Sequence, residues 1–249
     1  MQLPLLFGES EFWLRSISVL FGLALLSVVY AAAYRFYNLR TAITAVLILL
    51  TGNLFVGYMT KLNTDIPYSF FVFTGVVCWI LSYKKSGLAW ISGLLLGLAV
   101  LEKGLSVTPY IAALFFTLFI DLKKQYVLNF GKLLLAFLIT ILPWHLYQYV
   151  TNGNAFLQVY FFEHIIKRAT QPVEFHYEGR LFYTKLLWQN FMPWIIFGLA
   201  ILAGIVLWLR KHPTIKEVRL NIKKHLATTV FILVFTIVFI SISNARPLS

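Results

Sequence analysis

Apolar runs of about 20 residues, separated by short polar connections, recur along most of this chain. A helix needs roughly 20 mostly apolar residues to cross a hydrocarbon core of about 30 Å, so runs of this length predict membrane spans. They fall at Ser16–Arg35, Thr41–Met59, Ile66–Tyr83, Lys84–Leu101, Leu105–Ile120, Leu128–Tyr147, Phe191–Arg210 and Leu226–Asn244. The sequence therefore predicts a polytopic membrane protein with about eight transmembrane helices.

Composition supports this class, because 60% of the residues are hydrophobic and only 12% are charged, which is unlike a soluble domain. No alternating ten-residue strand pattern competes with the apolar runs, so the predicted fold is all-α. We expect residues 1–249 to form a single membrane domain. The common metal and nucleotide motifs are missing from the sequence, which predicts neither a metal nor a cofactor.

The net charge of +12 would suggest a nucleic-acid partner in a soluble protein, but basic residues also gather at cytoplasmic helix ends. If the N-terminus lies outside and the spans alternate, thirteen of the 21 Lys and Arg residues fall on one side, and most acidic residues fall on the other. The sequence thus favours membrane lipids over nucleic acid as partners. The thirteen are Arg35, Arg40, Lys84, Lys85, Lys123, Lys124, Lys132, Arg210, Lys211, Lys216, Arg219, Lys223 and Lys224.

One charge pair, Glu102–Lys103, interrupts the apolar stretch 88–120. As one helix that stretch would extend about 50 Å, too long for one crossing but suited to two short helices that meet at an outer turn. Gly104 permits the turn, with Glu102 and Lys103 at its tip. Polar residues at the headgroup level explain such a pair; the alternative is that Lys103 binds a phosphate and Glu102 orients it.

Other polar residues of the predicted outer face allow the same two interpretations. Asp65 precedes a span that has Pro67 in its first turn, so it is either an anionic helix start or a carboxylate of an active site. Arg15 could simply pair with Glu11, four residues before it.

The segment 148–190 is predicted to be an outer loop that contains interfacial helices. Phe156, Leu157, Tyr160, Phe161, His164, Ile165 and Arg168 recur at helical spacing. His164 and His176 do not match a usual zinc spacing, so we interpret them as polar surface groups first and as substrate contacts second.

Several motifs occur in an order that resembles a known family. "FGESEFWLRSISVLFG", "TKLNTDIPYSFFVF" and "GLLLGLAVLEKGLSVTPYIAALF" are followed by "LPWHLYQYVTNGNAFLQVYFFEHIIKR" and "FHYEGRLFYTKLLWQNFMPW". This order resembles the polyprenyl-phosphate-sugar-dependent membrane glycosyltransferases, which include protein O-mannosyltransferases and the lipid A aminoarabinose transferase.

The resemblance implies a GT-C-like fold that transfers a sugar from a polyprenyl-phosphate donor to a lipid, glycan or protein acceptor at the outer face of the membrane. It makes Lys103 the first candidate for binding the donor phosphate, with Arg168 and Arg15 as further candidates. Candidate site contacts are Asp65, Glu102, His164 and His176. The expected location is the inner membrane of a bacterium.

In one respect the sequence departs from the family pattern. Family members carry an acidic residue in the first outer loop, and the resemblance places that loop upstream of Met1. We therefore expect a fragment of a larger glycosyltransferase, inactive alone, whose catalytic acid lies upstream. The alternatives are a transporter of lipid-linked sugars and a non-catalytic membrane scaffold. Carboxylates in the middle of the predicted spans, common in transporters, are missing.

Overall fold

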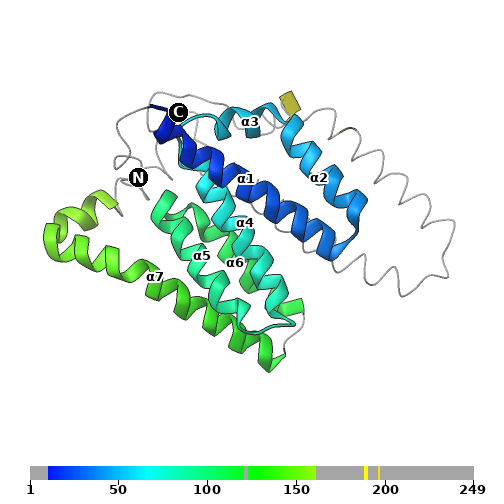
Figure 1. Ribbon diagram of the computed structural model, residues 1–249. Coiled ribbons are helices and arrows are strands. Elements are labelled where there is room, and N and C mark those ends of the chain that lie inside the picture. The colour runs from blue at the N-terminus through cyan, green and yellow to red at the C-terminus, as the bar shows by residue number, and fades with distance from the viewer. Residues whose placement is uncertain (1–10, 121–122, 161–187, 190–195, 197–249) are drawn as a thin grey trace, which may run out of the picture. The chain divides into compact units, whose positions relative to one another are not determined.

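The computed structural model describes residues 11–120, 123–160, 188–189 and 196, and every regular element in these ranges is helical. The chain divides into two compact units, residues 1–156 and 157–249, and the helices below belong to the first, with α7 ending one residue beyond it. In chain order they are α1 (Glu11–Phe36), α2 (Leu39–Thr51), α3 (Asn53–Met59), α4 (Asp65–Ser82), α5 (Leu88–Lys103), α6 (Thr108–Thr117) and α7 (Lys124–Leu157), with short 3₁₀ helices at Gly104–Val107 and Leu118–Ile120 (Figure 1).

Three helical segments in the described ranges are long and apolar enough to cross a membrane: Arg15–Phe36, Asp65–Ser82 and Lys124–Tyr160. The first two nearly coincide with the predicted spans Ser16–Arg35 and Ile66–Tyr83. The third contains the predicted span Leu128–Tyr147 and continues into the segment 148–190, which the sequence predicts to be a loop. The predicted spans 191–210 and 226–244, and most of the predicted loop 148–190, lie outside the described residues. The all-helical membrane class is therefore confirmed, whereas the count of eight helices stays a prediction.

The predicted span Thr41–Met59 is not one helix, because the chain divides it into α2 and α3 at Gly52. Gly52 is buried and has an extended backbone, with φ −78° and ψ 111°. Glycine is a poor helix former, and a buried site without a side chain lets the backbone change direction there. With 13 residues, α2 is about 20 Å long, shorter than the hydrocarbon core of a bilayer.

The predicted turn after Lys103 is confirmed. Gly104 ends α5 with a positive φ of 62°, a conformation that L side chains rarely adopt. The chain then returns along α4, because Tyr68 contacts Ser106 at one end of α4 and Trp79 contacts Thr117 near the other. Helices α5 and α6 therefore form a short hairpin against α4.

The largest core lies among α4, α5, α6 and α7. Trp79 is fully buried in this core. Its indole N–H donates to Thr117 Oγ1 at 3.2 Å, and its ring packs edge-to-face with the rings of Tyr83 and Phe130. The other buried members are Val72, Leu96, Ala99, Val100, Val107, Leu114, Leu118, Phe130 and Leu133. A second, smaller core joins Leu25 and Leu26 of α1 to Phe55 and Ile66.

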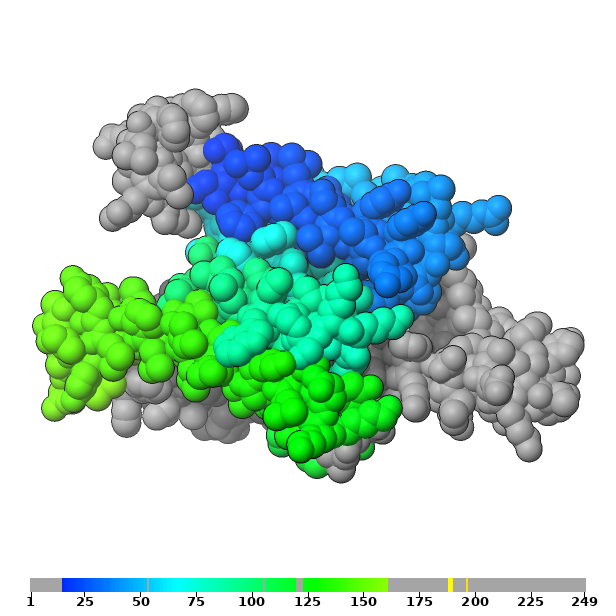
Figure 2. Space-filling model, turned by 60° about the horizontal axis from the view of Figure 1, so that its bottom comes forward, coloured from blue at the N-terminus to red at the C-terminus, as the bar shows by residue number. Residues whose placement is uncertain are grey.

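Helices α5 and α7 approach each other through two glycines four residues apart. A Cβ atom at Gly93 would overlap the carbonyl oxygen of Leu133, and one at Gly97 would lie 2.6 Å from Thr140 Cβ. Small residues at this spacing let the backbones of membrane helices come close. In Figure 2, α7 (green) accordingly lies along the part of the molecule formed by α4 to α6.

One face of α7 carries an apolar stripe that no other described residue covers. Leu135, Ile139, Leu142 and Leu146 are between 43% and 59% exposed and recur at intervals of three or four residues. A contiguous exposed stripe of this kind in a long apolar helix is typical of a surface that faces lipid.

Candidate functional site

The first turn of α4 is built around Asp65. The backbone N–H of Asp65 donates to Asn63 Oδ1 at 3.1 Å, and Ser69 Oγ donates to the Asp65 carbonyl at 2.7 Å. A carboxylate in the first turn also interacts favourably with the helix dipole. These local interactions place the Asp65 side chain at one end of the α4–α6 helices.

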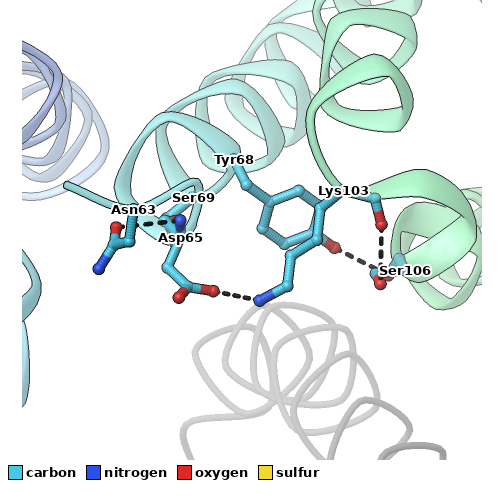
Figure 3. A network of polar contacts seen from close by, with 6 residues as sticks. All are labelled: Asn63, Asp65, Tyr68, Ser69, Lys103 and Ser106. Atoms are coloured by element: carbon cyan, nitrogen blue, oxygen red, sulfur yellow. Dashed lines mark hydrogen bonds and ion pairs between the residues drawn. The ribbon is translucent and has the colours of Figure 1, made fainter. Parts of the chain in front are cut away.

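Lys103 reaches the same place from the end of α5 (Figure 3). Its ammonium forms an ion pair with Asp65 and lies 5.8 Å from the centroid of the Tyr68 ring. The Tyr68 hydroxyl donates to the Ser106 carbonyl at 2.8 Å, and Ser106 Oγ donates to the Lys103 carbonyl at 3.1 Å. The first turn of α4 and the α5–α6 turn therefore hold one lysine between them.

This ion pair contributes little to stability, since the Lys103 and Asp65 side chains are 43% and 37% exposed. Exposed pairs are worth about 0–1 kcal/mol. What the pair does is fix the position of the ammonium, whose three N–H donors exceed what one carboxylate oxygen accepts. An anion that arrives from solvent can bind the same ammonium.

The structure brings two of the predicted site residues together, Asp65 and Lys103. Glu102 immediately precedes Lys103 in the last turn of α5, and the carboxylate that contacts the Lys103 ammonium is that of Asp65. Arg15 is exposed on the first turns of α1, near the end where Ser18 Oγ donates to the Asn63 carbonyl at 3.4 Å. The remaining candidates, His164, Arg168 and His176, lie outside the described residues.

Sequence reasoning missed Tyr68 and Ser106. A signal for Tyr68 was present, because a residue three positions after Asp65 lies on the same face of a helix. For Ser106 we find no such signal, since its carbonyl accepts from Tyr68, 38 positions away, and its Oγ donates to a backbone carbonyl. Where the structure describes side chains, no three His, Cys, Asp or Glu residues gather as a metal site.

Comparison with protein families and with curated proteins finds relatives of this chain. A family model described as "Dolichyl-phosphate-mannose-protein mannosyltransferase" matches residues 3–147, which include Arg15, Asp65 and Lys103. An uncharacterized protein of Aquifex aeolicus (strain VF5) is 29% identical over 64% of this chain and 33% of its own length. The undecaprenyl phosphate-alpha-4-amino-4-deoxy-L-arabinose arabinosyl transferases of Pseudomonas aeruginosa strains LESB58 and UCBPP-PA14 are each 28% identical over 76% of this chain and 36% of their own length.

This chain thus spans about a third of the length of the curated relatives it matches. No solved structure matches it. The family model nevertheless covers more than half of the chain, and the described helices are those of a membrane protein. The chain is therefore an integral membrane protein that belongs to the dolichyl-phosphate-mannose-protein mannosyltransferase family of GT-C-type glycosyltransferases.

Proposed function

We propose that this chain is part of a glycosyltransferase in which Lys103 binds the phosphate of a polyprenyl-phosphate sugar donor at the outer face of the membrane. The observation that supports this proposal is the position of Lys103, an exposed ammonium that contacts Asp65 and Tyr68 at the turn of the α5–α6 hairpin. The names of the arabinosyl transferases that match this chain specify a sugar linked to undecaprenyl phosphate, which supports a donor of this class.

In the reaction, the oxygen of an acceptor hydroxyl bonds to the anomeric carbon while the bond from that carbon to the phosphate oxygen breaks. The hydroxyl proton leaves to a base, and the lipid phosphate departs with the electron pair. A fixed cation stabilises the negative charge that grows on the leaving phosphate, which is an effective form of transition-state stabilisation. Lys103 is the group we assign to this role, with Asp65 as its positioning residue.

For the other candidate residues, the proposed roles rest on the sequence resemblance alone. Arg15 and Arg168 are proposed as further cations for the donor phosphate, and Glu102, His164 and His176 as contacts of the sugar or the acceptor. The acceptor is a lipid, a glycan or a protein.

Binding of undecaprenyl phosphate tests the assignment of Lys103. We expect Lys103→Gln, in the chain reconstituted in nanodiscs, to bind this lipid roughly tenfold or more weakly than the original chain, because a charge-assisted hydrogen bond is lost. Lys103→Arg should restore most of the affinity, since it keeps the charge. Lys61→Gln removes the same charge from an exposed residue of the α3–α4 connection and should leave the affinity unchanged.

Equal affinities for Lys103→Gln and Lys61→Gln would contradict the assignment and favour a scaffold without a lipid-phosphate site. Helix content measured by circular dichroism should be the same in all three variants, because Lys103 and Lys61 are both exposed.

We also propose an orientation in which the Asp65–Lys103 end faces outward from the inner membrane of a bacterium, with about eight crossings and an outer loop at 148–190. The opposite end supports this orientation, because Lys84, Lys85 and Lys123 lie in the connections there and Lys124 begins α7, and basic residues favour the cytoplasm.

Labelling of single cysteines tests this orientation. Cys78 is the only cysteine, so Cys78→Ser provides a background without thiols. In intact cells, a membrane-impermeant maleimide should label Thr60→Cys, at the Asp65 end, and should label Gly87→Cys only after the cells are broken. Both positions are exposed, and Gly87 has open space for a side chain. The reverse pattern would overturn the orientation.

A further inference from the structure

The end of α4 opposite Asp65 carries a second arrangement of polar side chains, where the α4–α5 turn meets α7. Asn129 is fully buried there, and its Nδ2 donates to the Ser82 carbonyl at 2.9 Å. Ser86 Oγ donates to Asn129 Oδ1 at 2.7 Å, and Gln125 Nε2 donates to the same oxygen at 2.9 Å. The ammonium of Lys132 donates to Ser86 Oγ.

This network leaves the charge of Lys132 without compensation. A serine hydroxyl has one hydrogen, and Ser86 gives it to Asn129, so the oxygen that faces Lys132 acts as a neutral acceptor. Two of the three donors of Lys132 still need partners. The described residues of this end, 82–92, 115–120 and 123–134, contain no Asp or Glu, and Asp121 lies outside the described residues.

The depth of Lys132 distinguishes it from the neighbouring lysines. It lies eight residues beyond Lys124, about 12 Å further along α7. Side chains of a helix point toward its N-terminus, which carries the Lys132 ammonium back toward the end of the bundle and toward Ser86. A charge at this depth requires a counter-charge or contact with the headgroup region.

The residues around Lys132 on α7 indicate what supplies that counter-charge. Leu128, four residues before it, and Leu135, three residues after it, are 51% and 50% exposed. On a helix these positions share the face of Lys132, and Leu135 begins the exposed apolar stripe. The ammonium therefore lies at the edge of a lipid-facing surface, where a lipid headgroup arrives together with its acyl chains.

We propose that Lys132, held by Ser86, binds the phosphate of an anionic phospholipid in the leaflet opposite the Asp65–Lys103 site. The exposed Lys84, Lys85, Lys123 and Lys124 lie just before Ser86 and at the start of α7, and they add attraction for an anionic headgroup. This site does not rest on the proposed transferase function, because it uses neither the donor lipid nor the outer face.

Lipid retention measured by native mass spectrometry tests the proposal. The chain is taken from nanodiscs of phosphatidylcholine with phosphatidylglycerol, and the bound lipids are counted by mass. We expect Lys132→Gln to retain roughly five- to tenfold less phosphatidylglycerol than the original chain, while phosphatidylcholine stays unchanged. Lys132→Arg should restore retention. Lys84→Gln combined with Lys85→Gln should also lower it, without touching the Ser86–Asn129 network.

Two control measurements distinguish a phospholipid bound at Lys132 from a free phosphate ion and from a lipid bound at Lys103. Inorganic phosphate in the buffer should not displace phosphatidylglycerol, and displacement would overturn the lipid assignment in favour of a free phosphate ion. Lys103→Gln should retain phosphatidylglycerol normally, and Lys132→Gln should bind undecaprenyl phosphate normally. The proposals for Lys103 and Lys132 can therefore be contradicted independently of each other. Unchanged phosphatidylglycerol retention in Lys132→Gln would show that Lys132 only reaches water.

Discussion

Trp79→Ala should lower the free energy of unfolding by about 3–5 kcal/mol, the range for removing a fully buried Trp or Phe side chain. Trp79 is 0% exposed and joins three helices, through Thr117 of α6, Phe130 of α7 and Tyr83 at the end of its own helix. No neighbouring side chain can fill a space of that size without moving a helix. The melting temperature in detergent, followed by circular dichroism, should fall accordingly.

Trp90→Ala is the matched control, since Trp90 lies on α5 and is 40% exposed. The same chemical change should alter the unfolding free energy there by no more than about 0.5 kcal/mol. Equal melting temperatures for the two variants would show that Trp79 is not at the centre of the α4–α7 core.

Gly93→Ala should destabilise the chain by about 1–3 kcal/mol, although alanine is the better helix former. The new methyl group would overlap the Leu133 carbonyl oxygen and lie 2.8 Å from Ala136 Cβ. A carbonyl of a helix backbone cannot rotate away as a side chain can, so α5 and α7 must separate. Gly97→Ala should act in the same direction, because Thr140 Cβ would lie 2.6 Å away.

Gly131→Ala provides the control for helix propensity. Gly131 lies on the exposed face of α7, and a methyl group there would meet nothing within 4 Å, so alanine should leave stability unchanged or raise it by up to about 1 kcal/mol. The two glycines are compared by thermal unfolding in the same detergent. A stabilised Gly93→Ala variant would show that α5 and α7 do not pack closely there.

Features that depend on neighbouring residues in the chain were predictable from the sequence. Apolar runs located α1, α4 and the central part of α7, and the charge pair Glu102–Lys103 followed by Gly104 located the turn between α5 and α6. Asp65 was recognised as a candidate because a carboxylate before an apolar run is itself a local pattern. The family followed from the order of such patterns and is confirmed by the match over residues 3–147.

Features that depend on packing were not predictable. Hydropathy averages over a window, so a single buried glycine such as Gly52 did not register as a break between α2 and α3. The pairing of Asp65 with Lys103 spans 38 positions, and Glu102 was the nearer carboxylate in the chain. Asp65 pairs with Lys103 because α4 and α5 pack antiparallel, which brings the first turn of α4 beside the last turn of α5. No single segment of the sequence encodes that packing.

The polar bonds that join the helices have a consequence for how such chains diverge. Ser92 Oγ donates to the Gly75 carbonyl at 2.8 Å, just as Asn129 donates to the Ser82 carbonyl, so α4 supplies main-chain acceptors to both neighbours. A main-chain carbonyl is present whatever side chain the position carries. Relatives can therefore carry other amino acids in α4 and keep both hydrogen bonds to its carbonyls. A substitution of Ser92 or Asn129, in contrast, removes one of these bonds. Alignment of α4 alone would underestimate how much of this architecture two distant chains share.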